Sequence, residues 1–172
     1  AQGMRFYSDR MPVSPLRLFW EEYIDSALED DLADISGVYL KPGGAFWVVV
    51  VEGTIVGMVA VEVVDKHQGV MELRRMSVAP CMKRSGLGSR LIGLVEDFAA
   101  NHGAREIVLT TGSLMAPARA LYLRNGFEPH RGEPRTTAAM RAAGQSFSIV
   151  SFRKPVTSAR GRWTWTPRKS SL

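Results

Sequence analysis

The chain has 172 residues, of which 45% are hydrophobic and 23% charged, a length and composition typical of one globular domain that folds alone. Its longest apolar run, residues 46–51, is far shorter than the roughly 20 residues that a membrane-spanning helix needs. A single cysteine, Cys81, excludes an intramolecular disulfide, and the three histidines show no ligand spacing, so we expect no metal site.

The net charge of +5 belongs to the C-terminal end of the chain. Six of the 22 Lys and Arg residues lie within residues 153–172, which hold no acid, so residues 1–152 carry the other 16 against 17 acids. This end lacks apolar periodicity and is rich in Ser, Thr, Pro and Arg, which predicts a flexible tail. A contact of Trp163 and Trp165 with a partner or a membrane surface is the alternative. We expect one domain over residues 1–152, a basic tail over residues 153–172, and no nucleic-acid partner.

Helical periodicity comes first along the chain. Apolar residues recur with helical spacing over residues 16–28 and resume at Leu32 and Ile35, which predicts one long helix or two short ones before Lys41. The acids Asp30, Asp31 and Asp34 are expected to form a solvated face of it, and a place beside a bound ligand is the alternative. Three β-branched runs then predict strands, the first two joined as a hairpin by Glu52-Gly53-Thr54: residues 46–51, 55–64 and 70–78.

Helices and strands alternate in the second half of the chain. An apolar stripe predicts a helix that ends at His102-Gly103. The stripe consists of Leu87, Leu91, Leu94, Val95 and Phe98. A strand, a helix with Ser113 near its N-cap, and a last strand are predicted to follow, with His130 in a loop: residues 106–111, 115–124 and 147–152. The fold class is α/β, with antiparallel strands leading into a strand–loop–helix–strand–helix unit.

The loop between the third strand and the next helix carries the chemical signal. It reads Lys83-Arg84-Ser85-Gly86-Leu87-Gly88. Glycines let the backbone approach a phosphate closely, and the helix N-terminus adds positive potential. Arg90 would add charge. A Walker A loop would need GxxxxGK[ST], which is absent, and a dinucleotide fingerprint would need glycine where Leu91 stands. The loop therefore indicates a phosphate-bearing ligand outside these two classes.

This loop resembles the coenzyme A loop of the Gcn5-related N-acetyltransferase (GNAT) superfamily: Arg or Gln, two residues, Gly, one residue, then Gly or Ala. Lys83 occupies the first position here. The preceding SVAP resembles the family's V-x-P, and ARALYLRNGF downstream matches A-x-x-L-Y-x-x-x-G-F, with Met115 replacing the usual Asn at its start. The resemblance implies the GNAT fold, a mostly antiparallel sheet flanked by helices, with splayed strands that form an acetyl-CoA cleft.

A narrower resemblance covers residues 23–130. YIDSALEDDLADI, GAFWVVV, TIVGMVA and ELRRMSV are similar to the camello-like N-acetyltransferases, which include enzymes that acetylate aspartate and cysteine S-conjugates. ELRRMSV looks closest to the aspartate N-acetyltransferases. Members of the group carry a hydrophobic membrane segment ahead of this region, and this sequence shows none. The resemblance implies a cytoplasmic catalytic domain, membrane-anchored if the chain is a piece of a longer protein.

The resemblance also assigns roles to individual residues. Glu72 matches the glutamate that acts as base in the superfamily's histone acetyltransferases, and a solvated or salt-bridged strand glutamate is the alternative. Tyr122 matches the tyrosine beside the coenzyme sulfur, where its phenol would return a proton to the thiolate, and a core tyrosine is the alternative. Covalent transfer through Cys81 is disfavoured because no base is expected nearby. Contacts to acetyl-CoA are expected from Met76, Ser77, Val78, Lys83, Arg84, Ser85, Gly86, Leu87, Gly88 and Ser89.

Arg74 and Arg75 are the expected acceptor-binding residues. Because strand side chains alternate, Arg74 shares a face with Glu72, and Arg75 faces the other way unless a bulge intervenes. An arginine there could bind a carboxylate of an amino-acid acceptor, and an ion pair with an acid such as Glu62 is the alternative. We expect an acetyl-CoA-dependent N-acetyltransferase that acts by direct transfer on a small amine. A protein or peptide lysine acetyltransferase and a non-catalytic acyl-CoA sensor stay open as alternatives.

Overall fold

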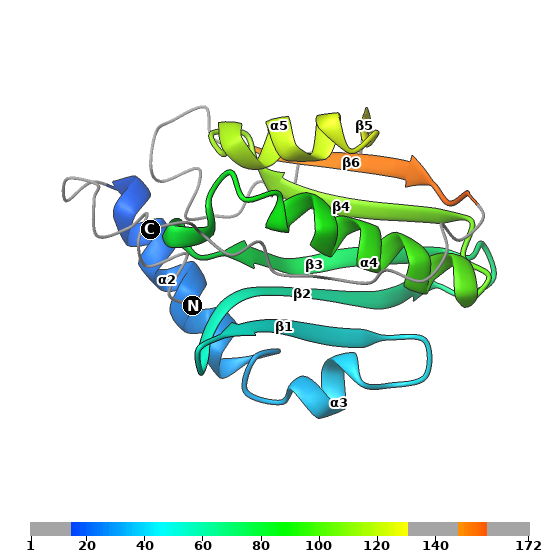
Figure 1. The fold of residues 1–172 in the computed structure, drawn as a ribbon, viewed down its shortest axis with the longest axis horizontal. Coiled ribbons are helices and arrows are strands. Elements are labelled where there is room, and N and C mark those ends of the chain that lie inside the picture. Colours follow the sequence, from blue (N-terminus) through cyan, green and yellow to red (C-terminus); the bar gives the residue numbers. More distant parts are fainter. Residues whose placement is uncertain (1–14, 131–147, 158–172) are drawn as a thin grey trace.

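A six-stranded sheet in the order β1-β2-β3-β4-β6-β5 forms the centre of the domain (Figure 1). The structure, a computed structural model, describes residues 15–130 and 148–157. Neighbouring strands are antiparallel except β3 and β4, which are parallel. The strands are β1 (Ala45–Val51), β2 (Thr54–Asp65), β3 (Val70–Val78), β4 (Glu106–Gly112), β5 (Glu128–His130) and β6 (Ile149–Pro155). The expected α/β fold class is confirmed.

Four α-helices and one 3₁₀ turn accompany the sheet in the described residues: α2 (Pro15–Glu29), α3 (Ile35–Tyr39), η1 (Pro80–Met82), α4 (Leu87–Asn101) and α5 (Ala116–Arg124). The first helical region therefore consists of two helices, and the Asp34 carboxylate caps the second by accepting from the Gly37 N–H at 2.8 Å. None of these helices is long and apolar enough to cross a membrane.

The core lies between the sheet and α4, which crosses one of its faces (Figure 1). The helix buries Leu87, Leu91 and Val95 as expected, together with Ile92. Leu94 and Phe98 are only partly buried, and the Phe98 ring meets Trp47 of β1 edge-on at 5.2 Å. The sheet residues of this core are Val56, Val59, Val61, Met71, Leu73, Ile107, Leu109 and Phe152. This packing fixes α4, and with it the loop before α4, over the centre of the sheet.

The β1–β2 turn is confirmed as a tight hairpin. Val51 pairs with Thr54, so Glu52 and Gly53 alone form the loop. Both have positive φ, 49° and 75°, as a type I′ turn requires to match the twist of its strands.

Three expectations about the second half are wrong. The helix α5 begins at Ala116, and its N-cap residue, Met115, provides no side-chain cap. The hydroxyl of Ser113, the residue expected near the cap, instead accepts from the Ser148 N–H at 3.0 Å. His130 lies in β5, paired with Ser151, and not in a loop. The last strand is β6, whose pairing with the whole of β4 carries it to Pro155.

The start of the expected tail belongs to the sheet. Arg153 and Lys154 are residues of β6, and the Val156 N–H donates to the Arg105 carbonyl at 2.9 Å. The Lys154 ammonium is held inside the domain: it pairs with Glu96 of α4 and donates to the Asn125 carbonyl at 2.6 Å. The basic residues at 153 and 154 are thus strand residues, and residues 158–172 lie outside the described part of the chain.

We expect Lys154→Ala to lower the free energy of unfolding by about 1–3 kcal/mol, because Glu96 is only 17% exposed and would lose its charge partner. Arg153→Ala is the matched control. Its side chain is 48% exposed and 3.9 Å from Glu106, so we expect a change below about 0.5 kcal/mol. Urea denaturation measures both, and equal losses would contradict the placement of Lys154.

Candidate active site

Strands β3 and β4 separate after a short stretch of pairing. Their register runs from Val70↔Glu106 to Glu72↔Val108, although β3 continues to Val78 and β4 to Gly112. Past this point β3 stays paired with β2, through Ser77 and Val78, while it diverges from β4 (Figure 1). The other edge of β3 therefore presents backbone groups that no described strand pairs with, and an extended ligand can bind such an edge as an added strand.

The loop that follows β3 is shaped for an anion. Arg84 and Gly86 both have left-handed backbones, with φ of 60° and 83°, and alternating conformations of this kind form anion-binding nests of amides. Ser85 stabilises the turn, donating to the Met82 carbonyl at 2.7 Å and accepting from the Leu87 N–H at 3.3 Å. Among the described residues, no atom lies within 4 Å of a Cβ placed at Gly86, so the left-handed backbone conformation is what favours glycine here.

Gly88 and Ser89 also hold α4 against α5. A Cβ at Gly88 would lie 2.9 Å from Leu121 Cδ2, so the glycine permits a close helix contact. The Ser89 hydroxyl accepts from Asn125 Nδ2 at 3.1 Å, and Asn125 also donates to the Leu121 carbonyl at 2.8 Å. The backbone N–H groups of Gly88 and Ser89 lie in the first turn of α4, where no intrahelical acceptor exists. The structure thus leaves amides, and not these side chains, for a ligand.

The basic side chains around this loop reach solvent, whereas the Leu87 side chain is buried. Lys83 and Arg84 are exposed and Arg90 is partly buried, so all three add positive potential around the turn. Leu87 is 6% exposed and belongs to the core. If Leu87 contacts the coenzyme as predicted, its backbone would have to make the contact.

Tyr122 combines a core position with a place near the site. It is 6% exposed and packs against Phe127 and Phe152, with ring centroids 5.9 and 6.0 Å away. Burial raises the pKa of its phenol to about 12, and the neighbouring Tyr23 adds to this effect. The phenol is therefore protonated at neutral pH. Tyr23 of α2 is thus close enough for its charge to act on Tyr122 of α5.

A β-bulge lies at Arg75. The register with β2 advances from Met58↔Ser77 to Ala60↔Arg74, so β3 contains one more residue than β2 between the two pairs, and Arg75 has a φ of 52°. The bulge lets Arg75 reach the same carboxylate on which Arg74 acts: Arg75 donates to Asp31, and the charge of Arg74 also lowers the pKa of Asp31. The sequence allowed Arg75 to depart from strand alternation only if a bulge intervened, and the structure shows such a bulge.

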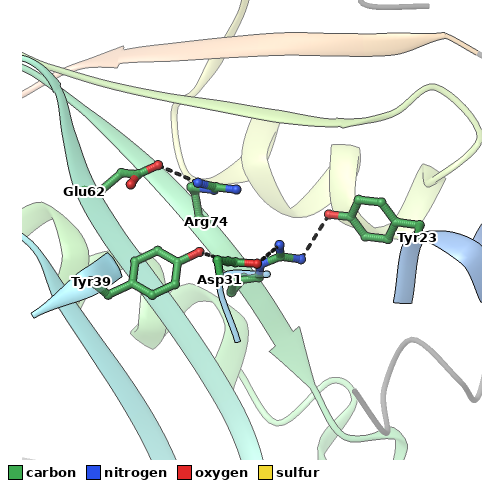
Figure 2. A network of polar contacts seen from close by, with 6 residues as sticks. Tyr23, Asp31, Tyr39, Glu62 and Arg74 are labelled. Atoms are coloured by element: carbon green, nitrogen blue, oxygen red, sulfur yellow. Dashed lines mark hydrogen bonds and ion pairs between the residues drawn. The ribbon is translucent and has the colours of Figure 1, made fainter. Parts of the chain in front are cut away.

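Arg75 is locked in a buried ion pair with Asp31. Its Nε donates to Asp31 Oδ2 at 2.6 Å, Nη2 donates to Oδ1, and Nη1 reaches the Tyr23 hydroxyl at 3.3 Å. The Tyr39 hydroxyl donates to the same carboxylate (Figure 2). Asp31 is 3% exposed, so its expected place on a solvated face is wrong. The physical reason is that α2 ends at Glu29 and the chain then turns this carboxylate back toward the sheet.

The pKa values in this network favour the ion pair. Burial alone would raise the pKa of Asp31, but hydrogen bonds from Arg75 and Tyr39 and the charges of the two arginines hold it below 3.8. Burial and the bond to Asp31 raise the pKa of Tyr39 to about 12. Burial would lower the pKa of Arg75, but the bond to Asp31 and the interactions with Tyr23 and Tyr39 together outweigh that effect and raise it.

Arg74 makes a more open contact. Its Nη1 donates to Glu62 Oε1 at 2.6 Å, and the two side chains are 32% and 24% exposed. Its guanidinium also lies 5.9 Å from the Tyr39 ring centroid. The alternative of an ion pair with Glu62 is thus the one observed. Glu72, which is partly buried, stands opposite Glu62 in the β2–β3 register and favours the charged form of Arg74.

Sequence reasoning did not find the roles of Tyr23, Asp31 and Tyr39. Tyr23 and Asp31 fall within YIDSALEDDLADI, so the resemblance of that segment was the only signal for them. Tyr39 had none. In the described residues, no three His, Cys, Asp or Glu side chains gather where they could hold a metal ion.

The model of the acetyltransferase (GNAT) family matches residues 13–127. The chain belongs to this family. It is 36% identical to N-acetylaspartate synthetase of Homo sapiens over 131 residues, which make up 76% of this chain and 40% of that protein. It is 31% identical to N-acetyltransferase family 8 member 2 of Rattus norvegicus over 157 residues, 88% of this chain and 66% of the relative. These relatives confirm the camello-like resemblance.

Solved structures confirm the fold. An acetyltransferase of the GNAT family from Staphylococcus aureus Mu50 superposes with a TM-score of 0.63 at 22% identity, covering 77% of this chain and 79% of that one. The chain spans about half the length of the curated relatives it matches, between 40% and 66% for the two above.

We expect Asp31→Asn to lower the free energy of unfolding by about 3–5 kcal/mol at pH 7, because Arg75 would stay buried without a counter-charge. The pKa of Asp31 is lowered by folding, so its contribution is present above pH 3.8 and is lost as pH falls through the folded pKa. The deficit of the variant should shrink over that window. Urea denaturation across pH measures it, with the exposed Asp34→Asn as control. A deficit that does not change with pH would contradict the ion pair.

Proposed function

We propose that this domain transfers an acetyl group from acetyl-CoA directly to the primary amine of a small amino-acid-like acceptor. The observation that carries the proposal is the divergence of β3 from β4 beside an anion-binding loop, in a chain of the GNAT family. The open edge of β3, the turn of amides before α4 and the buried phenol of Tyr122 would together form the site. Each meets a different need of thioester aminolysis.

The coenzyme would be held mostly by backbone. The amides of Gly88 and Ser89 at the start of α4 suit its pyrophosphate, and Lys83 and Arg84 add charge around the same position. Backbone groups of Met76 and Val78, on the open edge of β3, would hydrogen-bond the pantetheine arm. The same edge would polarise the thioester carbonyl and stabilise the negative charge that develops on its oxygen.

Glu72 is the proposed base. It lies in the last β3–β4 pair, at the point where the strands separate, and is partly buried. Its carboxylate would take a proton from the acceptor's ammonium group, directly or through water, and so expose the lone pair that attacks the thioester carbon. As the C–N bond forms and the C–S bond breaks, the second amine proton leaves to solvent or to the departing sulfur.

Tyr122 would act as a hydrogen-bond donor to that sulfur. A thiol has a reference pKa of about 8.5, whereas burial raises the pKa of this phenol to about 12. Complete proton transfer from Tyr122 to the thiolate is therefore uphill, while donation of a strong hydrogen bond is not. The high pKa also keeps the donor proton in place throughout the working pH range.

The acceptor class rests on the relatives and on charge. The name N-acetylaspartate synthetase at 36% identity supports an amino-acid acceptor, and the partly exposed Arg74 could bind its carboxylate. A lysine of a protein or peptide is the second candidate. It is favoured by the carboxylates of Asp31, Glu62 and Glu72, which outnumber the two arginines of the same network.

The test is thiol release from acetyl-CoA with aspartate, a cysteine S-conjugate, a polyamine and a lysine peptide as acceptors, in the wild type and in Glu72→Gln. We expect amine-dependent release that falls by about 10²–10⁴ in the variant at pH 7, and falls less at high pH where the amine is already deprotonated. Glu106→Gln, which removes another partly buried strand carboxylate, should keep full activity.

Turnover of the peptide alone would favour the second candidate. Coenzyme A binding without release by any amine would contradict an enzymatic function and favour an acyl-CoA sensor.

A further inference from the structure

We propose that Glu62 sets the acceptor selectivity of the site by competing with the acceptor's carboxylate for Arg74. The inference rests on the proposed function, because it concerns the acceptor side of the same site. It follows from a difference between two adjacent arginines, one of which can exchange its partner while the other cannot.

Arg75 cannot serve a ligand. The exposed fractions of the Arg75 and Asp31 side chains are 7% and 4%, and two guanidinium nitrogens already bond the Asp31 carboxylate. Opening this pair would leave two buried charges without partners, which is among the most unfavourable changes a protein interior can undergo. Arg75 therefore joins the β3 bulge to the segment after α2, and its expected role in acceptor binding is not supported by this geometry.

Arg74 is in a different position. It directs one nitrogen, Nη1, to Glu62, whereas a guanidinium carries five N–H donors in a planar fork. Both partners are partly exposed, at 32% and 24%, and ion pairs at such positions are weak because water stabilises the separated charges. An incoming carboxylate can therefore replace Glu62, or bond the remaining donors beside it.

The position of Glu72 gives this exchange a function. Glu72 and Arg74 are two residues apart on one face of β3, so their Cα atoms are about 7 Å apart. A small amino acid spans that separation between its amine and a carboxylate when a hydrogen bond is added at each end. Glu62 stands opposite Glu72 in the register with β2 and accepts a hydrogen bond from Arg74. It therefore lies beside the two side chains, Glu72 and Arg74, that such an acceptor would contact.

The consequence is a penalty that depends on the acceptor. An acceptor with a carboxylate must displace Glu62 or approach its negative charge, whereas a neutral or cationic amine binds without disturbing the Arg74–Glu62 pair. A carboxylate that bonds Arg74 through two parallel hydrogen bonds can overcome this penalty, and one that is badly placed cannot. Glu62 thereby lowers the affinity for acceptors whose carboxylate fits Arg74 poorly. The selectivity comes from competition between two carboxylates, that of Glu62 and that of the acceptor, for Arg74.

The test compares aspartate with its diamide, which keeps the amine and lacks both carboxylates. Glu62→Gln should raise the ratio of kcat/KM for aspartate over the diamide by about two- to fivefold, mainly through KM. Arg74→Gln should lower that ratio by about tenfold or more, because a charge-assisted pair is lost. Glu106→Gln, which frees Arg153 from a similar contact on another strand, should leave the ratio unchanged.

A Glu62→Gln variant that alters both acceptors equally, or that lowers the ratio, would overturn the inference. If the wild type turns over neither acceptor, the proposed function fails for this class, and calorimetric binding of aspartate to the coenzyme A complex decides the inference instead. Tighter aspartate binding to Glu62→Gln than to the wild type supports competition. Equal affinity, or no aspartate binding to any variant, overturns it. Coenzyme A affinity and circular dichroism of each variant show that its fold is intact.

Discussion

The parallel pairing of β3 with β4 ends at Glu72↔Val108, and every part of the candidate site depends on that ending. A parallel pair that continued would have used the backbone groups of Met76 and Val78 within the sheet. Because the strands separate, β3 is held by β2 on one side and has an open edge on the other. The start of α4 follows this open edge, and α5, which carries Tyr122, packs on α4 at Gly88 and Ser89.

The bulge at Arg75 is a second constraint on the same strand. A left-handed backbone at a residue other than glycine is unfavourable by about 1–2 kcal/mol, so it persists only where other contacts determine it. Here the buried carboxylate of Asp31 receives the Arg75 guanidinium and the Tyr39 hydroxyl. The ion pair thus holds the strand, the end of α2 and α3 in one arrangement. Arg74, next to it, stays partly exposed and able to bind a ligand.

The sequence predicted the elements of the fold well where local chemistry decides them. The segment Glu52-Gly53-Thr54 indicated the β1–β2 turn, although Thr54 belongs to β2. Gly103, with a φ of 69°, marked the end of α4. The family motifs located the loop and Tyr122. Motif spacing could not separate ligand contacts from packing, however, and the structure shows that the Gly88 position and the Ser89 side chain serve the α4–α5 contact.

Tertiary contacts decided the features that the sequence did not reveal. Nothing in Leu73-Arg74-Arg75-Met76 specifies a positive φ, so the bulge depends on Asp31, a residue distant in sequence. Helical periodicity placed Asp31 on a polar face, because the pattern does not show that the chain leaves the helix just before it. Lys154 extended β6 beyond the predicted end because Glu96, on another element, neutralises its charge. The catalytic roles of Glu72 and Tyr122 remain predictions.

Amide hydrogen exchange with and without coenzyme A tests most directly whether the open edge of β3 and the first turn of α4 form the binding site. We expect saturating coenzyme A to slow exchange at Met76, Val78, Gly88 and Ser89, because their N–H groups would gain acceptors. Exchange at Gly53, in the β1–β2 turn, should not change. Protection that appears elsewhere and not at these four amides would contradict the central claim that the divergence of β3 from β4 creates the site.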